Sequence, residues 1–261
     1  MNILSKIFHK KYITGKNNKV VAIKNGIEYK ILNNKSTLKI KGNNNTVVLN
    51  CDNCKNIQKI LPNGLLIDID GNNNRMELEM PLKFNNAKLN MQDDNNKITI
   101  KTTKKKIKDV WIMAGKESEV FIDTNSSIGQ GDFSITANGN YKEGHKVLIG
   151  KNFRPAKDVI IRTSDGHSLI DINTGIATNS PQDVIIEDDV WIMTRSMILK
   201  GSKISKGSAV AAYSLVNKKF DEENILLAGI PAKILKHNIK WDVRSYGAYM
   251  SDFEKEKEIC R

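Results

Sequence analysis

An apolar residue returns at every sixth position through much of the second half of the chain. The series runs through Ile186, Ile192, Ile198, Ile204, Val210 and Val216. A helix would need apolar residues at intervals of three and four, and a single strand would alternate at two over only a few residues. Because a constant interval of six fits neither, the series predicts a repeat architecture.

A second row of small or apolar residues precedes each member of this series by two positions. Residues two apart share one face of an extended segment, so each pair points inward and the residue between them points outward. One short strand per six residues follows, and three such strands make a triangular coil of about 18 residues. We therefore predict an all-β protein, a parallel β-helix whose second inward row is Val184, Val190, Ser196, Ser202, Ser208 and Ser214.

Upstream segments show a cruder form of the same repeat. LKIKGNNNTVVL (38–49), IDIDGNNNRMEL (67–78) and LNMQDDNNKITI (89–100) align as strand, Asn-rich corner and strand. Gly, Asn and Asp tolerate the left-handed backbone that a tight corner requires. We expect irregular coils of the same solenoid here, with a separate small β-domain as the alternative. Regular anchors begin with Ile122, Ile128, Ile149 and Ile161.

Composition and cysteine content indicate a soluble cytoplasmic protein. No stretch of the 261 residues approaches the about 18 apolar residues of a membrane helix, and the first residues lack the pattern of a signal peptide. Three cysteines, an odd number, suit a reducing compartment. Cys51 and Cys54 form a lone CDNC without a second cysteine pair or suitably spaced histidines, so we expect no metal site.

The formal net charge of +12 favours anionic partners. CoA phosphates, an acidic glycan and a membrane surface all qualify. No sequence signature of a nucleic-acid-binding module accompanies the charge, so we expect no nucleic-acid partner.

Several motifs together resemble a known family. They are TSDGHSL (163–169), the hexapeptide row IIEDDVWIMTRSMILKGSKISKGSAVAAYSLVNKKF (185–220) and LAGIPAKIL (227–235). They are similar to the left-handed β-helix acyltransferases of the hexapeptide-repeat family. Within it, they resemble bacterial O-acetyltransferases that act on capsular or lipo-oligosaccharide sugars, including sialic-acid polymers. The resemblance covers about residues 145–236, although most repeats lack the usual Gly after the anchor and GIPAK replaces GNPAK.

The resemblance implies left-handed coils, a homotrimer with active sites between neighbouring subunits, and acetyl-CoA lying along a groove near the later coils. From where the repeat is present, we divide the chain into an N-terminal extension (1–26), irregular coils (27–118), regular coils with the catalytic loop (119–220) and a C-terminal segment (221–261). The tail after 240 is expected to form either a helix on a neighbouring subunit or a flap over the acceptor site.

Acetyl transfer from a thioester to a hydroxyl needs a base, and imidazole suits neutral pH. His167 occupies the family-equivalent position. Asp165 and Asp171 are the nearby carboxylates that could hold its second ring nitrogen, with a backbone carbonyl as the alternative. His145, in the loop before a regular strand, is a candidate for lining the acceptor cleft.

The resemblance also implies the cofactor-binding residues. Trp191 faces outward in its repeat and would lie beside acetyl-CoA and the acceptor, with packing in the trimer as the alternative. Small residues would let the pantetheine chain lie against the backbone, and lysines would face the nucleotide phosphates. The candidates are Ala211, Ala212, Gly229, Pro231, Ala232, Lys218, Lys219 and Lys233.

These observations predict an acetyl-CoA-dependent O-acetyltransferase acting on a sugar hydroxyl of a bacterial surface polysaccharide or its precursor. The alternatives are an acetyltransferase for a nucleotide amino sugar or an antibiotic, and a non-catalytic β-helix binding protein. A γ-type carbonic anhydrase would need three zinc-binding histidines, and only His145 and His167 fall in the coil region.

Overall fold

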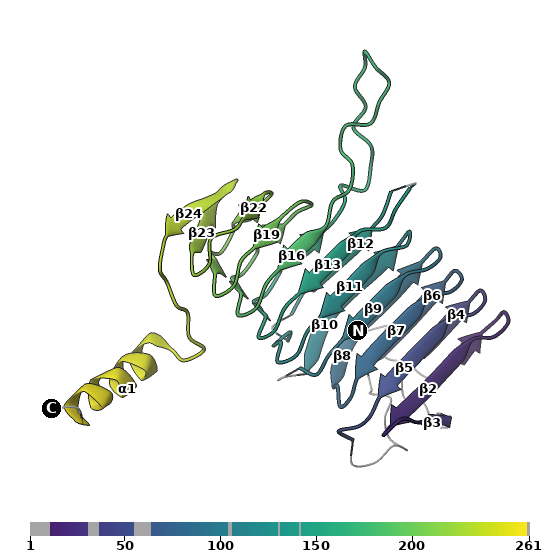
Figure 1. The fold of residues 1–261 in the computed structure, drawn as a ribbon, viewed down its shortest axis with the longest axis horizontal. Coiled ribbons are helices and arrows are strands. Elements are labelled where there is room, and N and C mark those ends of the chain that lie inside the picture. The colour runs from purple at the N-terminus through teal and green to yellow at the C-terminus, as the bar shows by residue number, and fades with distance from the viewer. Residues whose placement is uncertain are drawn as a thin grey trace, which may run out of the picture.

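The computed structural model describes residues 11–30, 37–54, 64–103, 106–129, 131–140 and 142–259. Within these ranges the chain forms strands β1 to β24 and the helix α1. The strands stack side by side along one long axis and enclose a continuous apolar interior (Figure 1). This is the predicted parallel β-helix.

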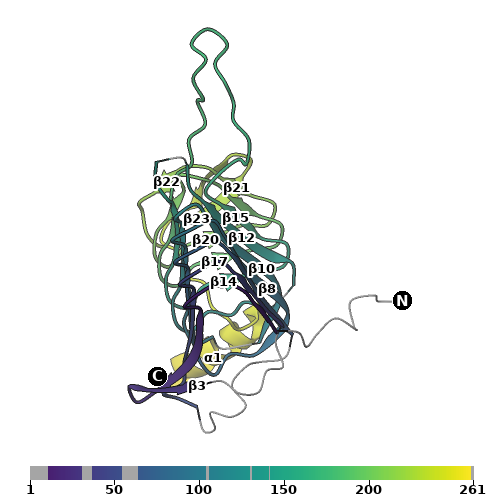
Figure 2. The same ribbon diagram turned by 90° about the vertical axis from the view of Figure 1, so that its right-hand side faces the viewer.

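Two long sheets run the length of the solenoid (Figure 2). The nine-stranded sheet is parallel throughout and contains, in order, β1 (Lys11–Ile13), β4 (Thr37–Lys41), β6 (Leu65–Asp70), β8 (Phe84–Gln92), β10 (Ile107–Gly115), β12 (Phe133–Asn138), β15 (Ile160–Arg162), β18 (Met197–Ile198) and β21 (Leu215–Val216). The ten-stranded sheet contains β22 (Lys219–Phe220), β19 (Lys203–Ile204), β16 (Val184–Ile186), β13 (Lys146–Ile149), β11 (Glu119–Ile122), β9 (Lys97–Ile100), β7 (Arg75–Glu79), β5 (Thr46–Asn50), β2 (Lys19–Lys24) and β3 (Ile27–Lys30). β3 is antiparallel to β2 and ends this sheet.

A third sheet begins only in the later coils. It contains β14 (Arg154–Pro155), β17 (Trp191–Ile192), β20 (Ala209–Val210), β23 (Leu226–Gly229) and β24 (Ala232–Lys236). β24 turns back antiparallel to β23 and closes that edge. The predicted three-strand coil therefore describes the regular repeats, whereas the earlier coils are built on the two long sheets.

The hexapeptide register is confirmed by the strand pairing. Ile186 pairs with Ile204, Ile192 with Val210 and Ile198 with Val216, so each coil advances by three hexapeptides. All six of these side chains are buried, as is the preceding row of Val and Ser. Several buried serines donate to backbone carbonyls of the next coil; Ser202 Oγ, for example, donates to the Val216 carbonyl at 3.0 Å.

The Asn-rich segments are coils of the same solenoid, as the sequence alignment predicted. Leu38 pairs with Ile67 and Ile67 with Leu89, which is the register of the three aligned sequences. Their corners contain left-handed residues, with φ of 58° at Asn44 and 56° at Asn73.

A ladder of buried asparagine side chains joins these corners. Asn74 N–H donates to Asn45 Oδ1 at 3.0 Å, Asn96 N–H donates to Asn74 Oδ1 at 2.9 Å, and Ser118 N–H donates to Asn96 Oδ1 at 2.9 Å. A net contribution of about 1 kcal/mol per bond is typical, and more is lost when a buried partner is left unpaired. The ladder fixes the stacking of coils that lack the regular hexapeptide.

Both ends of the chain differ from the expected division. β1 and β2 pair with β4 and β5, so coil structure extends into the segment 1–26 that we expected to be an extension; residues 1–10 lie outside the described ranges. At the other end, β23 and β24 still belong to the third sheet, and α1 (Tyr246–Ile259) follows. No helix in the described ranges combines the length and apolar character needed to cross a membrane.

One long insertion interrupts the regular coils. Between β15 and β16 the chain leaves the corner of the solenoid and projects far from its surface before returning (Figures 1 and 2). A single bridge, Ile170 to Ala177, joins its two arms in an antiparallel hairpin. This projecting loop, residues 164–181, carries His167.

Candidate active site

The tip of the projecting loop is a tight turn built by Asp171. Asp171 Oδ1 accepts the backbone N–H groups of Asn173 at 2.8 Å and Thr174 at 2.9 Å. These N–H donors, chiefly that of Thr174, hold the pKa of the Asp171 carboxyl below its ordinary value. The carboxylate is thus engaged by its own turn.

Asp165 also has partners other than the imidazole. Its Oδ2 accepts hydrogen bonds from Lys200 Nζ at 2.5 Å and from Asn179 Nδ2 at 2.9 Å. The hydrogen bond from Lys200, followed by that from Asn179, lowers the pKa of the Asp165 carboxyl. Within the part of the chain that the structure describes, neither Asp165 nor Asp171 forms a hydrogen bond with the ring of His167, whose side chain is exposed.

His145 lies at the stem of the projecting loop. Its Nδ1 is 3.0 Å from Asp183 Oδ1, and the same carboxylate oxygen accepts the backbone N–H of Lys146 at 2.9 Å. The His145 side chain is 13% exposed, and its Nε2 is buried with no hydrogen-bond partner among the described residues. Asp183 directly precedes β16, so this contact fixes the point at which the loop rejoins the solenoid. Its proposed place beside the acceptor stays a prediction.

Trp191 packs against a second tryptophan that the sequence analysis did not single out. Trp241 lies on the segment 237–245 that follows β24, with its ring centroid 6.1 Å from that of Trp191. Its indole Nε1–H donates to the Asp189 carbonyl at 2.5 Å, and the guanidinium carbon of Arg154 lies 6.0 Å from its ring centroid. The tail therefore crosses the outer face of the third sheet at Trp191.

Two cavities flank Trp241. The first, about 660 Å³, is lined by Trp191 with Ala212, Met193 and Arg244 among others. Its lining thus combines the aromatic rings of Trp191 and Trp241 with Ala212, one of the small residues predicted to face pantetheine.

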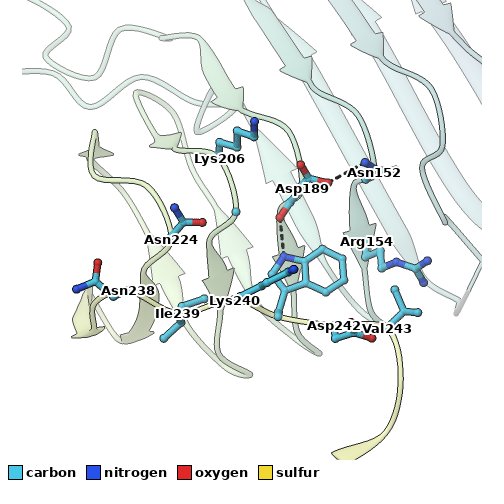
Figure 3. Close-up of a pocket in the computed structure, with 12 residues that line it drawn as sticks. Asn152, Arg154, Asp189, Lys206, Asn224, Asn238, Ile239, Lys240, Asp242 and Val243 are labelled. Carbon is cyan, nitrogen blue, oxygen red and sulfur yellow. Dashed lines mark hydrogen bonds between the residues drawn. The ribbon is translucent and has the colours of Figure 1, made fainter. Parts of the chain in front are cut away.

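The second cavity, also about 660 Å³, lies at the corner of the solenoid where the chain enters the strands of the third sheet (Figure 3). Asn152 Nδ2 donates to Asp189 Oδ1 at 2.7 Å at this corner. Cations are contributed by Arg154, Lys206 and Lys240. The lining also includes the carboxylates of Asp189 and Asp242, and its apolar part is formed by Trp241, Ile239 and Val243. A cavity of this size with apolar and polar groups can take a small-molecule ligand.

The remaining predicted cofactor residues lie at the same end of the solenoid but on different sheets. Gly229 and Lys233 belong to the β23–β24 hairpin with Pro231 and the buried Ala232, beside β20 on the third sheet. Ala211 N–H donates to the Leu227 carbonyl in the same region. Lys219 is part of β22 in the ten-stranded sheet, and Lys218 precedes it with Nζ 5.2 Å from the Phe220 ring centroid.

A metal-binding arrangement is not formed by the described residues: no three or more His, Cys, Asp or Glu side chains come together there. Cys51 and Cys54 are free, and burial is the main cause that raises the pKa of the Cys51 thiol to about 12. Because the thiolate is the form that binds metal, this buried thiol is poorly suited to that role. Cys260 lies outside the described residues.

Two curated relatives share one printed function. A polysialic acid O-acetyltransferase of Escherichia coli O1:K1 / APEC is 34% identical over 141 residues, which are 54% of this chain and 44% of that protein. A polysialic acid O-acetyltransferase of Neisseria meningitidis is 28% identical over 194 residues, 74% of this chain and 86% of that protein. The chain thus spans less than half of the Escherichia coli relative and most of the meningococcal one.

Two crystal structures match nearly the whole solenoid. The polySia-specific acetyltransferase NeuO has a TM-score of 0.65 at 26% identity, covering 94% of this chain and 98% of that one. The polysialic acid O-acetyltransferase OatWY has a TM-score of 0.57 at 26% identity, covering 96% and 99%. Over nearly its whole length the chain is thus similar to hexapeptide-repeat acetyltransferases.

The likeness to these structures establishes the left-handed coiling of this acyltransferase. Left-handed parallel crossovers are rare, and neither period nor composition indicates them. No family model matches the chain. Most repeats of this acyltransferase lack the usual Gly after the anchor, with Glu187, Met193, Leu199 and Ser205 in its place.

Proposed function

We propose that this acyltransferase is an acetyl-CoA-dependent O-acetyltransferase that modifies a sugar hydroxyl of a bacterial surface polysaccharide, with polysialic acid as the first acceptor to test. The observation that supports this most is the likeness to the two polysialic acid O-acetyltransferases over nearly the full length of each solved chain. These structures cover 94% and 96% of this chain.

In the proposed reaction, His167 acts as the general base. Its imidazole removes the proton from the acceptor hydroxyl as the oxygen attacks the thioester carbonyl of acetyl-CoA. The tetrahedral intermediate collapses with cleavage of the C–S bond, and the proton on His167 passes to the departing CoA sulfur. Exposure of His167 on a projecting arm is compatible with access to a large polymeric acceptor.

Acetyl-CoA, when bound, supplies the acetyl thioester. Its pantetheine arm would lie against Trp191 and Ala212, and the β23–β24 hairpin with Lys233 would border it. Arg154, Lys206 and Lys240 are close enough to one cavity to face phosphates. These residues fit the chemistry of CoA, which combines an apolar arm with anionic groups.

His167 and Trp191 lie on different parts of the chain's surface. The projecting loop leaves the corner between the nine- and ten-stranded sheets, whereas Trp191 lies on the third sheet. A homotrimer, in which the loop of one subunit reaches the third sheet of its neighbour, would bring them together. The exposed apolar side chains of the loop support this assembly; they are Leu169 at 64%, Ile170 at 62%, Ile172 at 97% and Ile176 at 65% exposure.

We therefore expect the wild-type protein to sediment as a trimer of its 29.3 kDa chain. Ile172→Asp places a charge in the proposed interface and should shift sedimentation to smaller species. Because the Ile172 side chain is 97% exposed in the single chain, Ile172→Asp should change the melting temperature of the monomer little. A wild-type monomer with full transfer activity would overturn the trimeric site.

The reaction is placed in the cytoplasm, where free thiols such as those of Cys51 and Cys54 persist. The charge of +12 suits an acidic acceptor and also association with an anionic membrane surface. Weakening of polysialic acid binding by added salt would indicate that the charge contributes to acceptor recognition.

The deciding experiment incubates the purified protein with acetyl-CoA and polysialic acid. We expect release of the CoA thiol and acetyl groups on the sugar by mass spectrometry. A neutral polysaccharide, a nucleotide amino sugar and an aminoglycoside serve as comparison acceptors. Transfer to one of the last two would favour the alternative enzymes, and the absence of thioester turnover with every acceptor would favour a binding solenoid.

A further inference from the structure

The arm of the projecting loop that carries His167 is held by one side chain on the opposite arm, Asn179. Asn179 Nδ2 donates to the His167 carbonyl at 2.8 Å and to Asp165 Oδ2 at 2.9 Å. Its Oδ1 accepts the backbone N–H of Leu169 at 2.7 Å. The single amide therefore binds the chain at His167 and two residues to either side of it.

Lys200 ties both arms to the solenoid. It follows β18, in the turn of a regular coil, and its side chain is 21% exposed. Its ammonium donates to Asp165 Oδ2 at 2.5 Å on one arm and to the Asn179 carbonyl at 2.9 Å on the other. Hydrogen bonds between ionised partners are stronger than neutral ones. The bond between Lys200 and Asp165 therefore holds the base of the loop against the solenoid.

Among the hydrogen bonds that the structure describes within the loop, that of Asn179 to the His167 carbonyl is the one made at His167 itself. The other contacts between the arms lie on the tip side of His167: the backbone N–H and the hydroxyl of Thr178 donate to the Leu169 carbonyl, and Asp171 N–H donates to the Ile176 carbonyl. The base nitrogen must come within about 3 Å of the hydroxyl oxygen whose proton it removes, and a misplacement of about 1 Å can lower the rate by about 10²-fold.

We propose that Asn179 and Lys200 are positioning residues for His167: together with Asp165 they form a clamp that fixes the backbone presenting the imidazole. This inference rests on the proposed function. Asp165 was expected to hold the ring of His167, which is two residues away in sequence. In the clamp its carboxylate instead joins Lys200 to Asn179.

The test compares Asn179→Ala and Lys200→Met with Lys200→Arg and with the control Asn173→Ala, which truncates an asparagine at the turn of the same loop. We expect kcat to fall about 10- to 100-fold for Asn179→Ala and Lys200→Met, with KM for acetyl-CoA within about twofold. Lys200→Arg, which keeps a donor to Asp165, should retain activity within about fivefold, and Asn173→Ala within about twofold.

A double mutant separates positioning from substrate binding. Because Asn179 acts through His167, adding Asn179→Ala to His167→Ala should cause no further loss. An equal additional loss in the His167→Ala background would overturn the inference.

Hydrogen exchange supplies a readout that does not depend on turnover. In Asn179→Ala, peptides covering residues 163–170 should exchange at least about tenfold faster, whereas those of β13 stay protected. Unchanged exchange would refute the clamp even if the wild type has no acetyltransferase activity. Faster exchange with an unchanged kcat would show that the clamp does not position the base. Failure of transfer by the wild type alone would contradict the proposed function.

Discussion

Replacement of His167 by Ala is expected to lower kcat for acetyl transfer by at least about 100-fold, because general-base catalysis typically contributes 10²- to 10⁴-fold. The loss should appear in kcat, since His167 does not line either cavity beside Trp241. The side chain is exposed and makes no contact with the apolar interior, so the melting temperature should change by no more than a few degrees. Steady-state kinetics with acetyl-CoA and polysialic acid measure the first effect, and calorimetry of CoA binding verifies the intact cofactor site.

The matched control is Asn173→Ala, at the turn of the same loop. It should retain turnover within about twofold. If His167→Ala kept turnover within tenfold of the wild type, His167 would not be the base. His145→Ala is a less suitable control for folding, because the His145 ring is packed against Asp183 at the loop stem and its loss would also loosen the loop.

The regular coils could be predicted because the hexapeptide repeat is a local pattern repeated many times. Each inward pair is visible in the sequence, and the pairing of Ile186 with Ile204 follows from the period alone. The Asn-rich corners made the register of the earlier coils predictable too. Leu38, Ile67 and Leu89 pair in the register in which the three sequence segments align. The first coil was not predicted, although KYITGKNNKVVA (11–22) shows the same order of strand, Asn-containing corner and strand as the three aligned segments.

The candidate site was predictable only in part. The resemblance indicated His167 and Trp191, but distance in sequence could not identify the partners of the carboxylates: Asp165 bonds to Lys200 across the stem of the loop, and Asp171 bonds to its own turn. Asn179 is separated from His167 by the whole turn of the hairpin. Trp241 belongs to a tail without any period, and only an isolated aromatic in a polar segment could have signalled it.

Gly42→Ala is expected to lower the stability of the solenoid strongly. Gly42 stands at an Asn-rich corner with φ of +108°, where a residue with Cβ is strained, and an added Cβ would lie 1.9 Å from the Gly71 carbonyl oxygen. That oxygen accepts the side-chain N–H of the buried Asn45 at 2.8 Å, so any movement also disturbs the asparagine ladder. Backbone strain of about 1–2 kcal/mol and overpacking of about 1–3 kcal/mol together lower the free energy of unfolding by about 2–5 kcal/mol.

Gly26→Ala separates the clash from the strain. Gly26 also has a left-handed backbone, with φ of +75°, but an added Cβ there has no atom within 4 Å. It should cost only the strain, about 1 kcal/mol, or a few degrees in melting temperature, whereas Gly42→Ala should lower it by about 10 °C. Thermal unfolding followed by far-UV circular dichroism measures both. Equal shifts for the two variants would mean that the coils separate easily at this corner, contrary to the close stacking of Gly42 on Gly71 that the asparagine ladder requires.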